Sequence, residues 1–91
     1  MRRVRVTVSG RVQGVFFRVT CAERAREAGV AGWVGNRSDG SVEAVFEGHD
    51  EDVAGLVSWC REGPSMAAVT GVDQEELEPT GEQGFTLRST A

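Results

Sequence analysis

The chain has 91 residues, which is enough for one domain and one hydrophobic core. Its net charge of −4 disfavours a general binder of nucleic acids or membrane surfaces, because both of those partners attract a basic face. All ten basic residues are arginines, which excludes chemistry that needs a lysine, and the single histidine, His49, excludes a histidine-rich metal site. We therefore expect one domain over residues 1–91 and no metal site.

The first three predicted elements are a strand, a loop and a helix. Valine alternates with polar residues over 4–8, which is typical of a strand with one buried face. Residues 10–14 break this alternation and indicate a loop that contains two glycines. Small side chains then recur at helical spacing, so we predict an amphipathic helix over 17–28 that ends at Gly29.

A hairpin is the next predicted element. Residues 32–37 and 41–47 flank a Ser-Asp-Gly turn, and Asp-Gly is a strong signal for a tight hairpin. Alternation in the second strand directs its apolar residues toward the core. By the same alternation we expect Glu43 and Glu47 to face water.

The second half of the chain predicts a helix and two strands. Asp50 is expected to cap a helix whose apolar residues recur at helical spacing and which ends before Gly63. Residues 67–76 contain a strand with a bulge at Gly71, and residues 85–88 form a short last strand. The order βαββαβ with a C-terminal edge strand predicts a ferredoxin-like α+β sandwich, in which an antiparallel sheet carries both helices on one face.

This topology brings three parts of the chain to one edge of the sheet. The first strand runs toward Gly10, the first helix returns, and the second strand runs in the same direction as the first. The loop 10–17, Arg18 in the first helical turn and Asn36 at the end of the second strand therefore meet at this edge. We expect a functional site there.

The loop before the first helix has two interpretations. Backbone amides at a helix N-terminus lack helical partners, and with the helix dipole they suit a phosphate or carboxylate. Gly10 and Gly14 permit the positive φ angles that such a loop needs. The same glycines fit a plain connection between a strand and a helix, so the loop alone does not decide between the two.

Arg18 favours an anion site. It falls on the inward stripe of the helix with Cys21 and Ala25, at a helix end that is unfavourable for a cation. No acidic residue lies at a nearby inward position, and a bound dianion would offset the cost of the buried charge. Asn36 adds a carboxamide that can accept a hydrogen bond from water. A structural salt bridge for Arg18 and a turn-forming role for Asn36 are the alternatives.

Two segments resemble the signatures of the acylphosphatase family. Residues 10–18, Gly-Arg-Val-Gln-Gly-Val-Phe-Phe-Arg, are similar to the family's phosphate-loop signature almost residue for residue. Residues 32–43 are similar to its second signature, with Gly35 where the family often carries a basic residue. The likeness extends more loosely over the rest of the chain, so it covers essentially all of it.

The resemblance implies a ferredoxin-like hydrolase that cleaves acyl phosphates, such as acetyl phosphate or 1,3-bisphosphoglycerate, to a carboxylate and inorganic phosphate without a metal or cofactor. Arg18 matches the family's phosphate-binding arginine, and Asn36 matches its water-positioning asparagine. The implied phosphate-binding loop comprises Gly10, Arg11, Val12, Gln13, Gly14, Val15, Phe16 and Phe17.

We expect a cytoplasmic monomer that binds neither nucleic acid nor membrane. The sequence has no export feature and no apolar run of the ~18–20 residues that cross a bilayer, and Cys21 and Cys60 are expected to be reduced. The alternative function is a non-catalytic binding or accessory module of the same fold, for a small ligand or RNA. An RNA-binding sheet would need exposed aromatic residues, whereas the predicted open face carries Arg5 and Thr7 on one strand and Glu43, Val45 and Glu47 on another.

Overall fold

Two helices and five strands follow one another in the predicted order along residues 1–91, all of which the computed structural model describes. Neither helix is long and apolar enough to cross a membrane. The elements are β1 (Arg2–Arg11), α1 (Phe17–Glu27), β2 (Ala31–Asn36), β3 (Val42–Gly48), α2 (Asp50–Cys60), β4 (Ala68–Leu77) and β5 (Phe85–Thr90).

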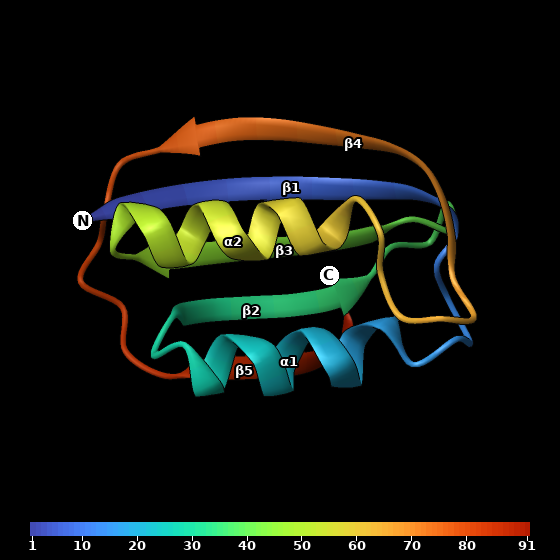
Figure 1. The fold of residues 1–91 in the computed structure, drawn as a ribbon, viewed down its shortest axis with the longest axis horizontal. Helices are drawn as coiled ribbons and strands as arrows, with labels where there is room; N and C mark the ends of the chain where they lie inside the picture. Colours follow the sequence, from blue (N-terminus) through green and yellow to red (C-terminus); the bar gives the residue numbers. More distant parts are fainter.

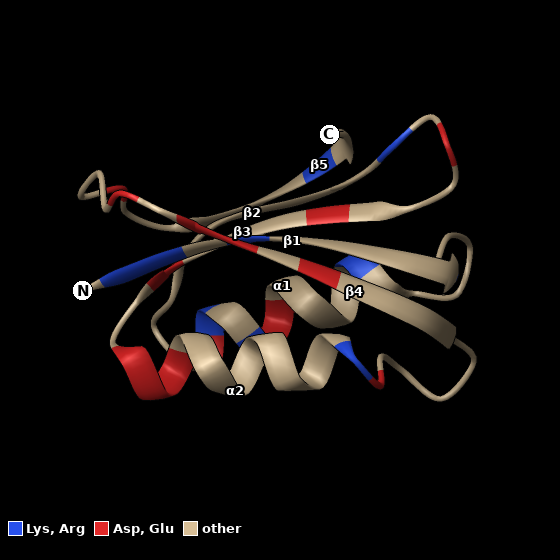
Figure 2. Ribbon diagram, turned by 90° about the horizontal axis from the view of Figure 1, so that it is seen from above, with Lys and Arg blue, Asp and Glu red and all other residues tan.

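The strands form one sheet in the order β4-β1-β3-β2-β5, and both helices cover the same face of it (Figures 1 and 2). This arrangement is the predicted two-layer sandwich. The sheet is mixed rather than wholly antiparallel, because β5 pairs in parallel with β2. The chain leaves β4 at one edge, crosses the end of the sheet where β2 begins, and therefore enters β5 in the direction of β2 (Figure 1).

β1 is longer than the predicted strand over residues 4–8. It continues to Arg11 because β4 pairs with it as far as Ala68. The register shifts between Ser9 and Gly10, so that Thr70 is the extra residue of a bulge beside Gly71. The bulge thus lies next to its predicted position. Pairing with β4 extends β1 to Arg11, into residues that were expected to form a loop.

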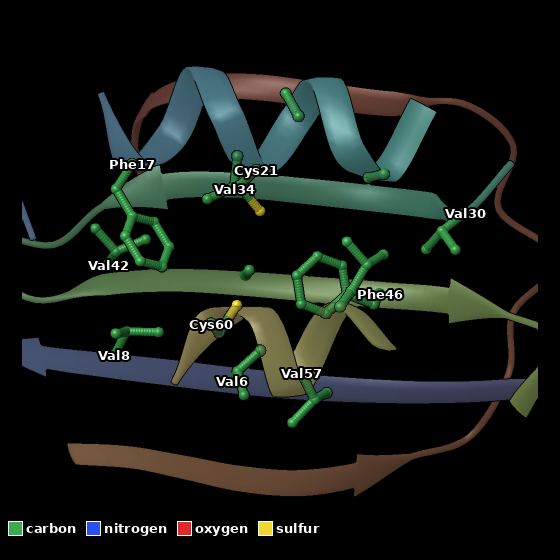
Figure 3. Close-up of a cluster of buried hydrophobic side chains, with 14 of the residues drawn as sticks. Val6, Val8, Phe17, Cys21, Val30, Val34, Val42, Phe46, Val57 and Cys60 are labelled. Carbon is green, nitrogen blue, oxygen red and sulfur yellow. The ribbon is translucent and has the colours of Figure 1, made fainter. Parts of the chain in front are cut away.

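The hydrophobic core lies between the helices and the sheet and contains 19 buried residues. The alternating valines of β1 are fully buried, as their period of two predicts. Figure 3 shows Phe17 and Cys21 of α1 and Cys60 of α2 within this layer. Both cysteines are free thiols, and the neighbouring Cys60 together with burial raises the pKa of the Cys21 thiol. The protonated Cys21 thiol is a poor nucleophile. Both cysteines are buried and pack as small apolar side chains.

Glu47 is buried, which contradicts the prediction that it faces water. Its side chain is 2% exposed and accepts hydrogen bonds from the amides of Thr80 (3.0 Å) and Gly81 (2.7 Å) and from Arg3 (2.8 Å). Burial alone would raise the pKa of this carboxyl, but those donors outweigh it and lower the pKa to about 2. The loop between β4 and β5 covers Glu47, and alternation within β3 cannot predict a cover that comes from elsewhere in the chain.

The predicted cap of α2 is wrong by one residue. His49, in extended backbone, precedes the helix and makes no side-chain capping bond, whereas Asp50 is the first helical residue. Three acidic residues occupy the first turn of α2, where they complement the positive end of the helix dipole. This acidic turn and the first turn of α1 lie at opposite ends of the molecule (Figure 2). The strongest acidic cluster of the helices is therefore far from the first turn of α1.

Candidate active site

A pocket opens where the β1–α1 loop, the first turn of α1 and the end of β2 meet, at the right-hand end of the sheet in Figure 1. Its volume is about 300 Å³. Arg18 and Asn36 both line it, so the two predicted catalytic residues share one pocket. The residues around it are Val12, Gly14, Phe16, Phe17, Arg18, Val19 and Asn36.

The loop before α1 leaves a run of backbone amides without a partner in the protein. Thr20 is the first amide of the helix to donate along the chain, to the carbonyl of Phe16 at 3.1 Å. No hydrogen bond is formed by the amides of residues 14–19, and α1 has no acidic residue in its first turn. The loop therefore presents donors and the positive end of a helix dipole to the pocket.

Two residues with left-handed backbone shape this loop. Gly14 has φ +73, and a side-chain carbon built there would meet nothing within 4 Å, so its pocket side is open. Phe16 has φ 65 and is the only residue other than glycine with a positive φ. The left-handed region is costly for an aromatic residue and turns the chain sharply into the helix.

Gly10 and Arg11 do not belong to the loop, although the resemblance groups them with it. Both pair with β4, and neither lines the pocket. A side-chain carbon at Gly10 would lie 2.3 Å from the carbonyl oxygen of Ala68, and its φ is +115. The close approach of the β4 backbone beside the bulge requires glycine at this position, which is a structural reason. Val12 and Val15 are 1% and 3% exposed and anchor the loop in the core.

Gln13 connects the loop to the β2–β3 turn. Its Nε2 atom donates to the carbonyl of Arg37 at 2.8 Å and to the carbonyl of Ser41 at 2.9 Å. These two carbonyls flank the tip of the hairpin that follows Asn36. The resemblance places Gln13 in the phosphate-binding loop, and in the structure its side chain links the two segments that form the pocket.

Arg18 is half-buried at the pocket and does not join the inward stripe of α1. The core position at the start of the helix belongs to Phe17, which is 1% exposed and packs on Trp59 at a ring distance of 5.0 Å. The Arg18 guanidinium donates through Nη1 to the carbonyl oxygen of Arg88 at 2.7 Å and forms no ion pair with an acidic side chain. Its charge is held in place by a neutral acceptor and is not neutralised.

The contact with β5 was not predicted. The side chain of Arg88 lies over the ring of Trp33, 4.2 Å from the ring centre, while its carbonyl receives Arg18. The local sequence around residues 85–88 does not predict the contact between Arg18 and β5, because this contact depends on the parallel pairing of β5 with β2.

Asn36 ends β2 and pairs with Val42 across the hairpin. Its Oδ1 atom is buried and has no hydrogen-bond partner in the protein, which is unusual for a polar atom inside a folded chain. The backbone carbonyl of the same residue accepts from the amide of Ala91 at 2.7 Å. The neighbouring Gly35 lets the C-terminal residues Thr90 and Ala91 approach β2 closely, because a side-chain carbon at Gly35 would lie 3.0 Å from their backbone.

Comparison with known proteins places this arrangement in a family. A family model described as Acylphosphatase matches residues 4–87. The acylphosphatase of Haloarcula marismortui is 55% identical over 86 residues, which are 94% of this chain and 94% of that protein. The acylphosphatase of Rubrobacter xylanophilus is 60% identical, over 96% of this chain and 80% of its own.

Solved structures agree with the sequence matches. The crystal structure of acylphosphatase from Bacillus subtilis has a TM-score of 0.92 at 35% identity and covers 97% of this chain and 99% of its own. The predicted ferredoxin-like fold and the predicted family are thereby confirmed, and an enzyme is favoured over the alternative of a non-catalytic module. The chain belongs to the acylphosphatase family.

Proposed function

We propose that the chain hydrolyses acyl phosphates in the pocket between the β1–α1 loop and β2, with Arg18 and Asn36 as its catalytic residues. One observation carries the proposal. The guanidinium of Arg18, which has no acidic partner, and Asn36, whose Oδ1 atom is buried and has no hydrogen-bond partner, are both at this pocket, beside amides that donate to no protein group. Unsatisfied donors and an unsatisfied acceptor at one place fit an anion together with a water molecule.

The donors bind the phosphoryl group. The amides of residues 14–18 and the Arg18 guanidinium hold the oxygens that become equatorial in the transition state. Phosphoryl transfer passes through a loose transition state, which is stabilised mainly by positioning and by positive charge. The positive charge of Arg18 is not neutralised by an acidic side chain. It can therefore stabilise the negative charge that is spread over the three phosphoryl oxygens in the transition state.

Asn36 orients the attacking water through Oδ1. The water oxygen forms a bond to phosphorus while the bond from phosphorus to the bridging oxygen breaks, and the carboxylate leaves with the electron pair. The leaving group is the conjugate base of an acid with a pKa of about 4, so it needs no proton from a general acid. Arginine cannot accept the proton of the water, and a phosphate oxygen of the substrate takes it. The products are a carboxylate and inorganic phosphate.

A metal-free assay tests this proposal. We expect hydrolysis of benzoyl phosphate in the presence of EDTA. Turnover of p-nitrophenyl phosphate should be low, because p-nitrophenolate is a poorer leaving group than benzoate. Inorganic phosphate should inhibit competitively, because it is a product that occupies the same donors. Failure of the unsubstituted chain to hydrolyse either acetyl or benzoyl phosphate would contradict the proposal.

The remaining properties that we propose follow from the same arrangement. We propose that residues 1–91 act as a single domain, since one hydrophobic core and one sheet carry the pocket, and that the enzyme acts as a monomer. The open face of the sheet carries ion pairs from Arg5 to Glu43 (3.2 Å) and Glu75 (2.9 Å), a surface unsuited to nucleic acid. We place the enzyme in the cytoplasm, where its two free thiols stay reduced.

A further inference from the structure

Phe16 combines two unfavourable features. Its backbone is left-handed, and its side chain is 70% exposed although it is one of four phenylalanines in the chain. The ring joins neither of the two aromatic pairs of the protein, which are formed by Phe17 with Trp59 and by Phe46 with Phe85. Neither the backbone geometry nor the packing of the fold explains an aromatic residue at this position.

Val19 exposes a second apolar side chain beside it. The side chain is 47% exposed, and its position three residues after Phe16 places it on the same side of the first helical turn. Both residues line the pocket that holds Arg18 and Asn36. The other apolar lining residues, Val12 and Phe17, are each 1% exposed and belong to the core. Phe16 and Val19 therefore provide the apolar surface that a molecule in the pocket can touch.

The pocket has two chemically different parts, and an acyl phosphate has the same two parts. Gly14, Arg18 and Asn36 offer donors, a positive charge and a free acceptor for the phosphoryl group and water. Phe16 and Val19 offer only hydrocarbon. Arg18 is the only charged lining residue, and Gly35, beside Asn36, adds no cation. A second negative charge on the acyl group would find no partner here.

We propose that Phe16 and Val19 form the acyl subsite of the enzyme and that its preferred substrates are acyl phosphates with an uncharged, apolar acyl group, aromatic groups included. This assignment rests on the proposed function. An aromatic acyl group gains contact with the exposed ring of Phe16, and aromatic pairs attract each other beyond the effect of the area that they bury. An acetyl group is too small to reach the same contact.

The experiment compares kcat/KM for benzoyl phosphate and acetyl phosphate in the unsubstituted chain and in Phe16→Ala, Phe16→Leu and Val19→Ser. We expect Phe16→Ala to lower the ratio of benzoyl to acetyl phosphate about five- to tenfold. Val19→Ser should lower it about twofold, and Phe16→Leu should restore most of it. Met66→Ala is the matched control, because Met66 is 55% exposed and does not line the pocket.

Two further readouts separate a subsite from a change in loop geometry. The inhibition constant of inorganic phosphate should stay within twofold in Phe16→Ala, since the anion donors are backbone amides and Arg18. NMR titration with benzylphosphonate and methylphosphonate measures the acyl-side preference without turnover. An unchanged ratio, or an equal loss for both substrates with weaker phosphate inhibition, would overturn the assignment. Absence of turnover of both substrates by the unsubstituted chain, with benzylphosphonate still preferred, would instead contradict the proposed hydrolysis and leave the apolar subsite supported.

Discussion

Two regions of the molecule gather backbone amides and an arginine around one point. At Glu47, the amides of Thr80 and Gly81 and the guanidinium of Arg3 surround a carboxylate that the chain itself provides. At the pocket, the loop amides and Arg18 surround no acidic side chain. The first region is complete within the protein and serves the fold. The second lacks an anion of its own, and this difference supports the proposal that it binds an external one.

Loss of Arg18 should have the largest effect of any single change. We expect Arg18→Ala to cost at least about 3 kcal/mol of transition-state stabilisation, which is more than 100-fold in kcat/KM, with kcat lowered and KM raised. The thermal midpoint should change little, because the guanidinium contacts only one backbone carbonyl. Arg61→Ala, which removes the same charge from an exposed position, should retain activity. An Arg18→Ala enzyme with near-normal turnover would mean that the pocket needs no cation.

Asn36→Ala sharpens the division of labour inside the pocket. The proposed role of Asn36 is to orient water through Oδ1, an atom that has no partner in the protein, and not to hold phosphate. We therefore expect kcat to fall about 100-fold while KM and inhibition by phosphate stay within a few-fold. Steady-state kinetics with benzoyl phosphate measure both parameters, and competition with inorganic phosphate measures the anion site alone. A loss confined to KM would assign Asn36 to substrate binding instead.

At Glu47 we expect a loss of stability without a loss of activity. Glu47→Gln should lower the free energy of unfolding by about 2 kcal/mol, because Arg3 loses a buried partner and the amides lose a charged acceptor. Activity per folded molecule should be unchanged, since Glu47 does not line the pocket. Urea unfolding followed by fluorescence gives the stability, and kinetics at low temperature give the activity. A variant that is stable but inactive would contradict the separation of the two regions.

The pH dependence of stability gives the smallest effect and the finest test. The pKa of Glu47 is lowered from 4.5 to about 2 by folding, so its contribution is fully present above about pH 5 and is lost as pH falls toward 2. The difference in unfolding free energy between the unsubstituted chain and Glu47→Gln should therefore narrow over this range. Parallel curves from pH 6 to pH 2 would show that the carboxylate is not held in its charged form.

Sequence reasoning predicted the features that depend on local periodicity. The alternation of valine in β1 and the Asp-Gly turn located the strands, and the resulting topology placed Arg18 and Asn36 at one edge. It failed where partners come from distant segments. The loop that covers Glu47 lies more than thirty residues along the chain, and β5 receives Arg18 across a separation of 70 residues. The spacing of residues within one helix or strand does not predict such contacts.

Gln13 shows the same limit and has a consequence for binding. One side-chain amide joins the loop to both carbonyls beside the hairpin tip, so the donors before α1 and the end of β2 are held as one body. The conformational entropy of the loop is thus lost when the chain folds, and little remains to be lost when a ligand arrives. In a protein with so small a core, the two hydrogen bonds of Gln13 and the buried side chains of Val12 and Val15 together favour a preorganised cavity.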